Sequence, residues 1–98
     1  MNERYRVRTQ MIRGRRYKVK YVKYLGPKTD GDCDAPHIRD RCIRVVDNKT
    51  ISEKKRLVIT IHEAMHACVW DLSEEAVTES SESIGELLHR LGYRQVIL

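Results

Sequence analysis

Residues 57–69 read LVITIHEAMHACV, a stretch that is apolar almost throughout and predicts a helix in the centre of a small domain. Inside it, His62 and His66 are four positions apart, so on a helix they lie on one face. From that face they can present two imidazole nitrogens to one metal ion. Glu63 follows the first histidine, where its carboxylate can reach a metal-bound water and act as a general base.

Zinc is the metal that this pattern favours. Imidazole suits Zn²⁺, and a catalytic zinc site has three protein ligands and keeps one position for water. The H-E-x-x-H pattern also arises by chance in about one chain in a hundred of this length and composition. The alternative is therefore a buried, metal-free helix in which the histidines and the glutamate only satisfy each other.

The extended motif H-E-x-x-H-x-x-G-x-x-H supplies a third histidine, but this chain has Leu72 at that position. The third ligand is therefore expected from another segment, the following helix. Two features of that helix point to different glutamates. The buried seam of that helix, extended back one heptad from Ser81, reaches Glu74, and a carboxylate facing the core must bind something. A tight antiparallel helix pair instead sets residue 79 or 80 beside the histidines. Glu74 is preferred, and Glu79 and Glu75 remain open.

Local patterns predict the other elements. Alternating apolar residues indicate strands at 4–13, 16–25 and 41–46, with the first two paired as a hairpin. Residues 26–39 are rich in Gly, Pro and Asp and predict a long loop. The order β-β-loop-β-α-α predicts one α+β domain over residues 1–98, with a small three-stranded antiparallel sheet packed on two helices.

Capping residues predict where the helices begin and end. Thr50 and Glu53 fit a capping box for a helix over about 52–69, and Ser73 is a good N-cap for a second helix ending near Leu91. Gly92 is the expected residue just past that end. The buried seam of the second helix is expected to comprise Val77, Ser81, Ile84, Leu88 and Leu91, and residues 96–98 to pack back on the core.

Charge is distributed unevenly along the chain. Residues 1–28 hold ten Lys/Arg and one acid, whereas residues 62–98 hold two bases and seven acids. A basic N-terminal hairpin fits an acidic partner or nucleic acid. The alternative is that these cations are solvated side chains that protect exposed strand edges, which themselves permit dimerisation without requiring it.

The chain carries no sign of export or membrane insertion. The N-terminus lacks an apolar signal-peptide core, and no apolar run approaches the length of a membrane span. We therefore expect a cytoplasmic protein whose cysteines are free thiols. Cys68 is expected in the core, and the loop residue Cys33 is a candidate to reach the metal as a thiolate.

The chain resembles a zincin metallopeptidase of the gluzincin type. The resemblance rests on a strand at 42–46, a helix with His62-Glu63-x-x-His66, and a second helix where Glu74-Glu75-Ala76-Val77 approaches the E-x-x-A pattern of these families. It covers roughly residues 31–94, and it is similar in particular to minimal phage and prophage zinc peptidases and to the catalytic core of ImmA/IrrE-like peptidases.

This resemblance implies an intracellular zinc endopeptidase with a narrow substrate range, in the host cytoplasm if the protein is phage-derived. His62, His66 and Glu74 would be the zinc ligands and Glu63 the general base. The strand at 42–46 would be an edge along which a peptide pairs, with three substrate-binding residues: Ile43, Arg44 and Val45.

Two points stay open beside this reading. Three residues could stabilise the oxyanion, judged by residue type only: His37, His89 and Tyr93. The competing function is a zinc-stabilised basic protein that binds nucleic acid or a protein partner and has no peptidase activity.

Overall fold

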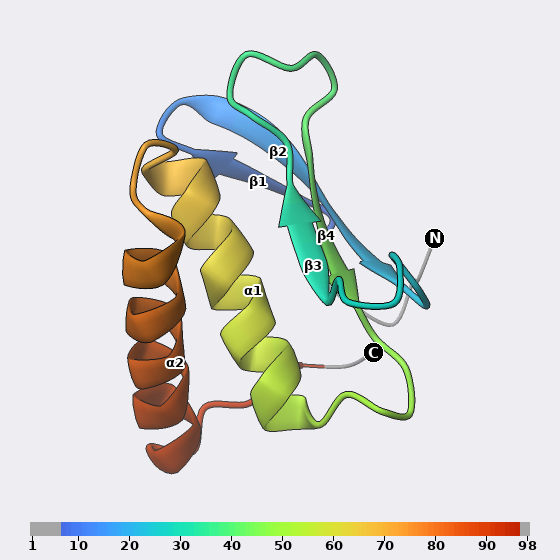
Figure 1. Cartoon of the computed structure of the whole chain (residues 1–98), viewed down its shortest axis with the longest axis vertical. Helices are drawn as coiled ribbons and strands as arrows, with labels where there is room; N and C mark the ends of the chain where they lie inside the picture. Colours follow the sequence, from blue (N-terminus) through green and yellow to red (C-terminus); the bar gives the residue numbers. More distant parts are fainter. Residues whose placement is uncertain (1–6, 97–98) are drawn as a thin grey trace.

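The computed structural model describes residues 7–96 and has a four-stranded sheet with two helices on one of its faces (Figure 1). α1 packs directly on the sheet against β3 and β4, and α2 packs on α1 as an outer layer. The α+β class is confirmed. The elements are β1 (Thr9–Ile12), β2 (Arg15–Val22), β3 (Gly31–Cys33), β4 (Cys42–Val46), α1 (Glu53–Cys68) and α2 (Glu74–Arg90).

The sheet differs from the prediction in strand number and direction. Its order is β1-β2-β4-β3, and β2 pairs with β4 in parallel, whereas β1 and β3 pair antiparallel with their neighbours. The prediction of three antiparallel strands is therefore wrong in detail. The additional strand β3 lies inside the segment predicted as loop, because three residues reading Gly-Asp-Cys carry no alternation that could identify a strand.

β4 lies inside the sheet, between β2 and β3, so its backbone pairs on both sides. The prediction that this strand offers a free edge to a peptide is wrong. Ile43 and Val45 are buried in the core. Arg44 points to the other face of the sheet, where it pairs with Asp32 at 2.9 Å and with Asp34 at 3.3 Å. Ile43, Arg44 and Val45 therefore do not lie along a free sheet edge.

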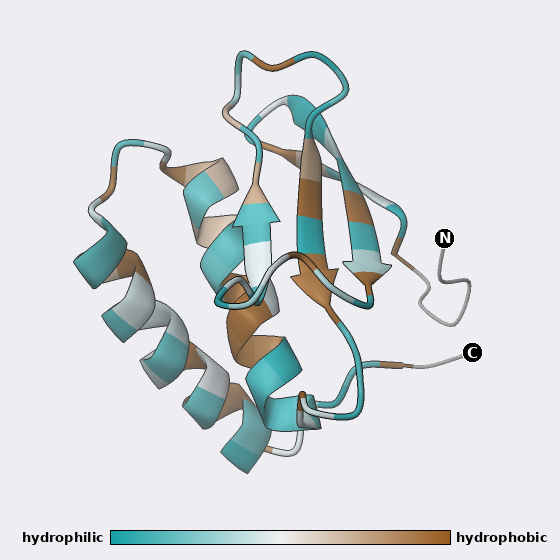
Figure 2. Ribbon diagram, turned by 45° about the vertical axis from the view of Figure 1, so that its right-hand side comes forward, coloured by the Kyte–Doolittle hydropathy of each residue, from teal (hydrophilic) through white to brown (hydrophobic). Residues whose placement is uncertain are grey.

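The core lies between the sheet and α1, where the apolar stretches of β4 and of the middle of α1 meet (Figure 2). A buried ion pair of 3.4 Å between Arg56 and Asp47 joins the start of α1 to the end of β4. Cys68 is exposed, which corrects its expected place in the core. The buried core residues are Tyr17, Ile43, Val45, Val46, Ile51, Ile59 and Ala67.

The helix caps are close to those predicted. Ser52, not Thr50, is the N-cap of α1, since its hydroxyl accepts from the backbone N–H of Lys55 at 3.1 Å. Ser73 caps α2 as expected, accepting from the N–H of Ala76 at 3.1 Å. Gly92 follows α2 with a φ of 94°, a conformation that favours glycine.

The contact between α1 and α2 depends on small residues of α2. Val77, Ser81 and Gly85 are buried there, whereas Ile84 is 42% and Leu91 64% exposed, so the predicted seam is wrong at its C-terminal end. Gly85 takes the place of Ile84 in the buried contact, because the two helices approach closely at that point. Among the described residues, neither helix has the length and apolar character needed to cross a membrane.

Replacing Gly85 with alanine is expected to destabilise the fold despite the better helix propensity of alanine. A Cβ at this position would lie 2.5 Å from Cγ2 of Val58 and 3.3 Å from its Cα, so the helices must separate. Overpacking of this kind costs about 1–3 kcal/mol. Urea unfolding measures the change, with exposed Ser83→Ala as control. A Gly85→Ala protein more stable than the parent would contradict this close approach.

Candidate metal centre

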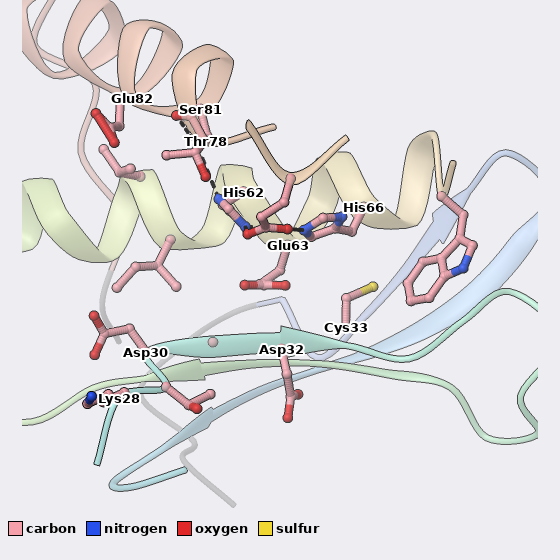
Figure 3. A pocket seen from close by; sticks show the side chains of 16 residues that line it. Lys28, Asp30, Asp32, Cys33, His62, Glu63, His66, Thr78, Ser81 and Glu82 are labelled. Carbon is pink, nitrogen blue, oxygen red and sulfur yellow. Dashed lines mark hydrogen bonds and ion pairs between the residues drawn. The ribbon is translucent and has the colours of Figure 1, made fainter. Parts of the chain in front are cut away.

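The side chains of His62 and His66 lie together on one side of α1 (Figure 3), and the carboxylate of Glu74 from α2 meets them there. Nε2 of His62 lies 3.2 Å from Nε2 of His66. The Glu74 carboxylate bridges them, with Oε1 2.9 Å from Nε2 of His62 and Oε2 2.9 Å from Nε2 of His66. The histidine side chains are 18% and 17% exposed and that of Glu74 is 69% exposed. Glu74 therefore reaches in from the rim and does not face the core as the seam argument required.

The short connection between the helices explains this meeting. α1 ends at Cys68, and the turn that follows is closed by a hydrogen bond from the N–H of Leu72 to the carbonyl of Val69 at 3.0 Å. Because α2 then begins at Glu74 and runs antiparallel, its first turn lies beside the last turn of α1, which holds His66.

A buried serine orients His62 from behind. Ser81 has no exposed surface, and its hydroxyl donates to the carbonyl of Thr78 at 3.1 Å. The same oxygen lies 3.4 Å from Nδ1 of His62, where it can accept the Nδ1 proton when Nε2 binds a metal ion. That tautomer leaves Nε2 of His62 with its lone pair directed at His66 and Glu74.

The donor set fits a zinc ion. Two imidazole nitrogens and two carboxylate oxygens converge within 3.2 Å of their nearest partners, and lone pairs at such distances repel unless a cation or protons lie between them. Two nitrogens bound to one tetrahedral zinc at about 2.05 Å lie roughly 3.3 Å apart, close to the separation found.

By distance, Glu63 belongs to the same potential metal-binding cluster as the two histidines. Its ligand atom and those of His62 and His66 all lie within 4.8 Å of one another. The side chain is 5% exposed, and within residues 7–96 it has no hydrogen-bond or ion-pair partner. The pKa of Glu63 is raised to about 7, first by burial and then by the charges of Asp32 and Glu74. The metal-free alternative assumed that the histidines and Glu63 satisfy each other by hydrogen bonding. Glu63 makes no such contact with them.

Gly31 allows β3 to lie against this carboxylate. A Cβ there would be 2.7 Å from Cγ2 of Ile59 and 3.0 Å from Oε2 of Glu63. Any other residue would displace the strand or the carboxylate. No local pattern predicts a role for Gly31, because its importance arises only from the packing of β3 on α1.

The centre opens into a cleft of about 710 Å³ between β3 and α2, with α1 as its floor (Figure 3). Trp70 forms part of the wall, with its ring 6.2 Å from that of His66. The lining residues are Lys28, Thr29, Asp30, Gly31, Asp32, Cys33, Val58, Ile59, His62, Glu63, His66, Trp70, Glu74, Thr78, Ser81 and Glu82.

Other candidates lie away from the cleft. Glu75 and Glu79 are exposed and are not among its described lining residues. The tight-pair argument placed residue 79 or 80 beside the histidines, but Ser81 occupies that position. The three residues considered for stabilising the oxyanion are also not among the described residues that line the cleft. They are His37, His89 and Tyr93.

Cys33 does line the cleft, as a thiol. Its Sγ donates to the carbonyl of Asp34 at 3.4 Å. The pKa of Cys33 is raised to about 12, first by burial and then by the charge of Glu63. The metal-free protein therefore keeps Cys33 protonated at neutral pH, which gives no support to a thiolate plug.

Removing the Ser81 hydroxyl is expected to weaken metal binding without unfolding the chain. Ser81→Ala leaves Nδ1 of His62 without its acceptor, and loss of such a partner costs about 10–100-fold in metal affinity. Competition with a zinc-binding dye measures the change, with exposed Ser83→Ala as control. An unchanged affinity in Ser81→Ala would show that the hydroxyl does not orient His62.

The arrangement as a whole provides three candidate ligand side chains, an unpartnered buried carboxylate and an open cleft. Such a set can hold a metal ion, activate water and accept an extended substrate. No family model matches the chain, and neither does any curated protein or solved structure.

Proposed function

We propose that the protein is a zinc-dependent metallopeptidase that hydrolyses peptide bonds. One observation carries the proposal: His62, His66 and Glu74 converge within hydrogen-bonding distance, and the unpartnered carboxylate of Glu63 lies beside them in an open cleft. A purely structural zinc site is closed by four protein ligands and needs no neighbouring base.

Metal binding and proton transfer are assigned to different residues of the site. His62, His66 and Glu74 would hold the ion, and Ser81 fixes the tautomer of His62. Bound zinc would supply polarisation of the scissile carbonyl and acidification of a water molecule. Glu63 accepts the proton of that water and returns it to the leaving amine.

A peptide fits the cleft as an extended chain. β3 is an edge strand and forms one wall of the cleft, so its free backbone groups are available to a substrate strand. This is the role that the sequence had suggested for β4. With only three residues, β3 offers few backbone hydrogen bonds, and side-chain contacts with Trp70, Val58 and Ile59 must supply much of the affinity.

The test is a search for cleavage with an unbiased substrate. Zinc-loaded protein is incubated with a peptide library made from a digested proteome, and new termini are identified by mass spectrometry. We expect new termini with a common sequence preference, which disappear when a chelator is added. Fully zinc-loaded protein that produces no new termini would contradict the proposal and favour the zinc-stabilised binding protein.

A further inference from the structure

The sheet face opposite the helices carries a row of cations on β2. Successive side chains of a strand point to opposite faces. Tyr17 is buried in the core beneath α1, so its neighbours point outward, and Figure 1 shows both helices on the core side only. The outward residues Arg16, Lys18 and Lys20 are exposed, and we call them the basic row.

Nothing among the described residues neutralises the basic row. None of its three side chains takes part in an ion pair within residues 7–96, and that part of the chain up to residue 28 holds eight Lys/Arg and no acid. By contrast, Arg44 on the same face is paired with Asp32 and Asp34. The acids of this face therefore gather at β3, and β2 keeps its positive charge.

Protection of a sheet edge does not explain these cations. Lysines on an edge strand prevent pairing with other chains. β2, however, lies inside the sheet, hydrogen-bonded to β1 on one side and to β4 on the other. The row must therefore be either a merely solvated surface or a surface that binds an anionic partner.

We propose that the basic row binds the phosphate backbone of duplex nucleic acid. Its cations repeat every second residue, about 6.6 Å apart, and so present a regular line of charge to a polyanion. The row contains no aromatic ring, since Tyr17 and Tyr21 lie on the other face, so it offers no stacking platform for single-stranded bases. Among the described residues that pair with the row, Met11 opposite Arg16 is the one exposed apolar side chain, which is too little to form the apolar centre typical of protein interfaces. The contact is therefore with the backbone and independent of sequence.

This binding is separate from the zinc centre. The described residues that line the cleft come from α1, α2, β3, the loop before β3 and Trp70, and none of them belongs to β2, which carries the row. Nucleic acid on the row leaves the cleft open. The inference goes beyond the proposed peptidase function and holds whether or not the protein cleaves peptides.

Salt dependence tests the inference. A short labelled DNA duplex of mixed sequence is titrated with the parent and with Lys18→Gln/Lys20→Gln at salt concentrations between about 50 and 200 mM. Each lost phosphate contact lowers the slope of log K against log salt by about 0.9, so we expect the double variant to lose about 1.8. The matched control is Lys49→Gln/Lys54→Gln, which removes two exposed lysines outside the sheet and is expected to keep the parental slope.

Several results would overturn the inference. They are an absence of binding at the lowest salt, an unchanged slope in the row variant, or an equal loss in the control. Tighter binding to poly-glutamate than to DNA would identify an acidic protein as the partner instead. Thermal melting confirms that each variant is folded, and Glu63→Gln is expected to bind DNA like the parent.

Discussion

Replacing Glu63 with glutamine is expected to abolish peptide cleavage and to leave zinc bound. Glutamine preserves the size of this buried side chain but cannot accept a proton. General base catalysis contributes about 10²–10⁴-fold to rate, so activity should fall by at least two orders of magnitude. Zinc should remain, because the atoms that meet at the centre come from His62, His66 and Glu74.

The measurement combines initial rates with zinc content after dialysis. Glu75→Gln is the matched control, since Glu75 is exposed in the first turn of α2 and the cleft lining does not include it. It should behave like the parent. Retained activity in Glu63→Gln would remove Glu63 from catalysis, and lost zinc would make it a ligand. Either outcome contradicts the role assigned to this carboxylate.

The same substitution is expected to stabilise the metal-free protein above pH 7. In the folded, metal-free chain the pKa of Glu63 is raised from 4.5 to about 7. Between these values the unfolded chain gives up a proton that the folded chain retains, so folding stability falls as pH rises through this window. At 1.36 kcal/mol for each pKa unit, the loss reaches about 3 kcal/mol near pH 8.

Urea unfolding of the chelator-treated protein tests this expectation at pH 4.5 and pH 8. Glutamine stays neutral at both, so Glu63→Gln should gain about 3 kcal/mol relative to the parent at the higher pH and little at the lower. The control Glu75→Gln changes an exposed acid and should show no such gain. Equal pH dependence of parent and Glu63→Gln would mean that burial does not penalise the charge of Glu63.

Local patterns predicted what depends on local geometry. The 3.6-residue period of a helix brings His62 and His66 together wherever the rest of the chain lies, and Ser73 marks the start of α2 through its own side chain. Glu74 was also selected from the sequence, although for a different orientation. The seam argument had it facing the core, whereas its carboxylate reaches the histidines from the surface.

Long-range packing set what the sequence did not reveal. A three-residue strand such as β3 has no detectable period, and without it β4 looked like an edge. Gly31 and Gly85 matter only because another element approaches them closely. Ser81 offered a usable signal, since a polar residue in a predicted buried seam needs a partner, and that partner is His62.

The central claim is that His62, His66 and Glu74 bind one zinc ion, and metal content measures this directly. Protein purified without added zinc is analysed beside His66→Ala and Glu74→Ala. The predicted result is about one zinc per parent chain and loss of zinc in both variants. Zinc lost only in His66→Ala would assign the third ligand to another residue. A parent that binds no metal even when zinc is offered would contradict the metal centre and the peptidase function with it.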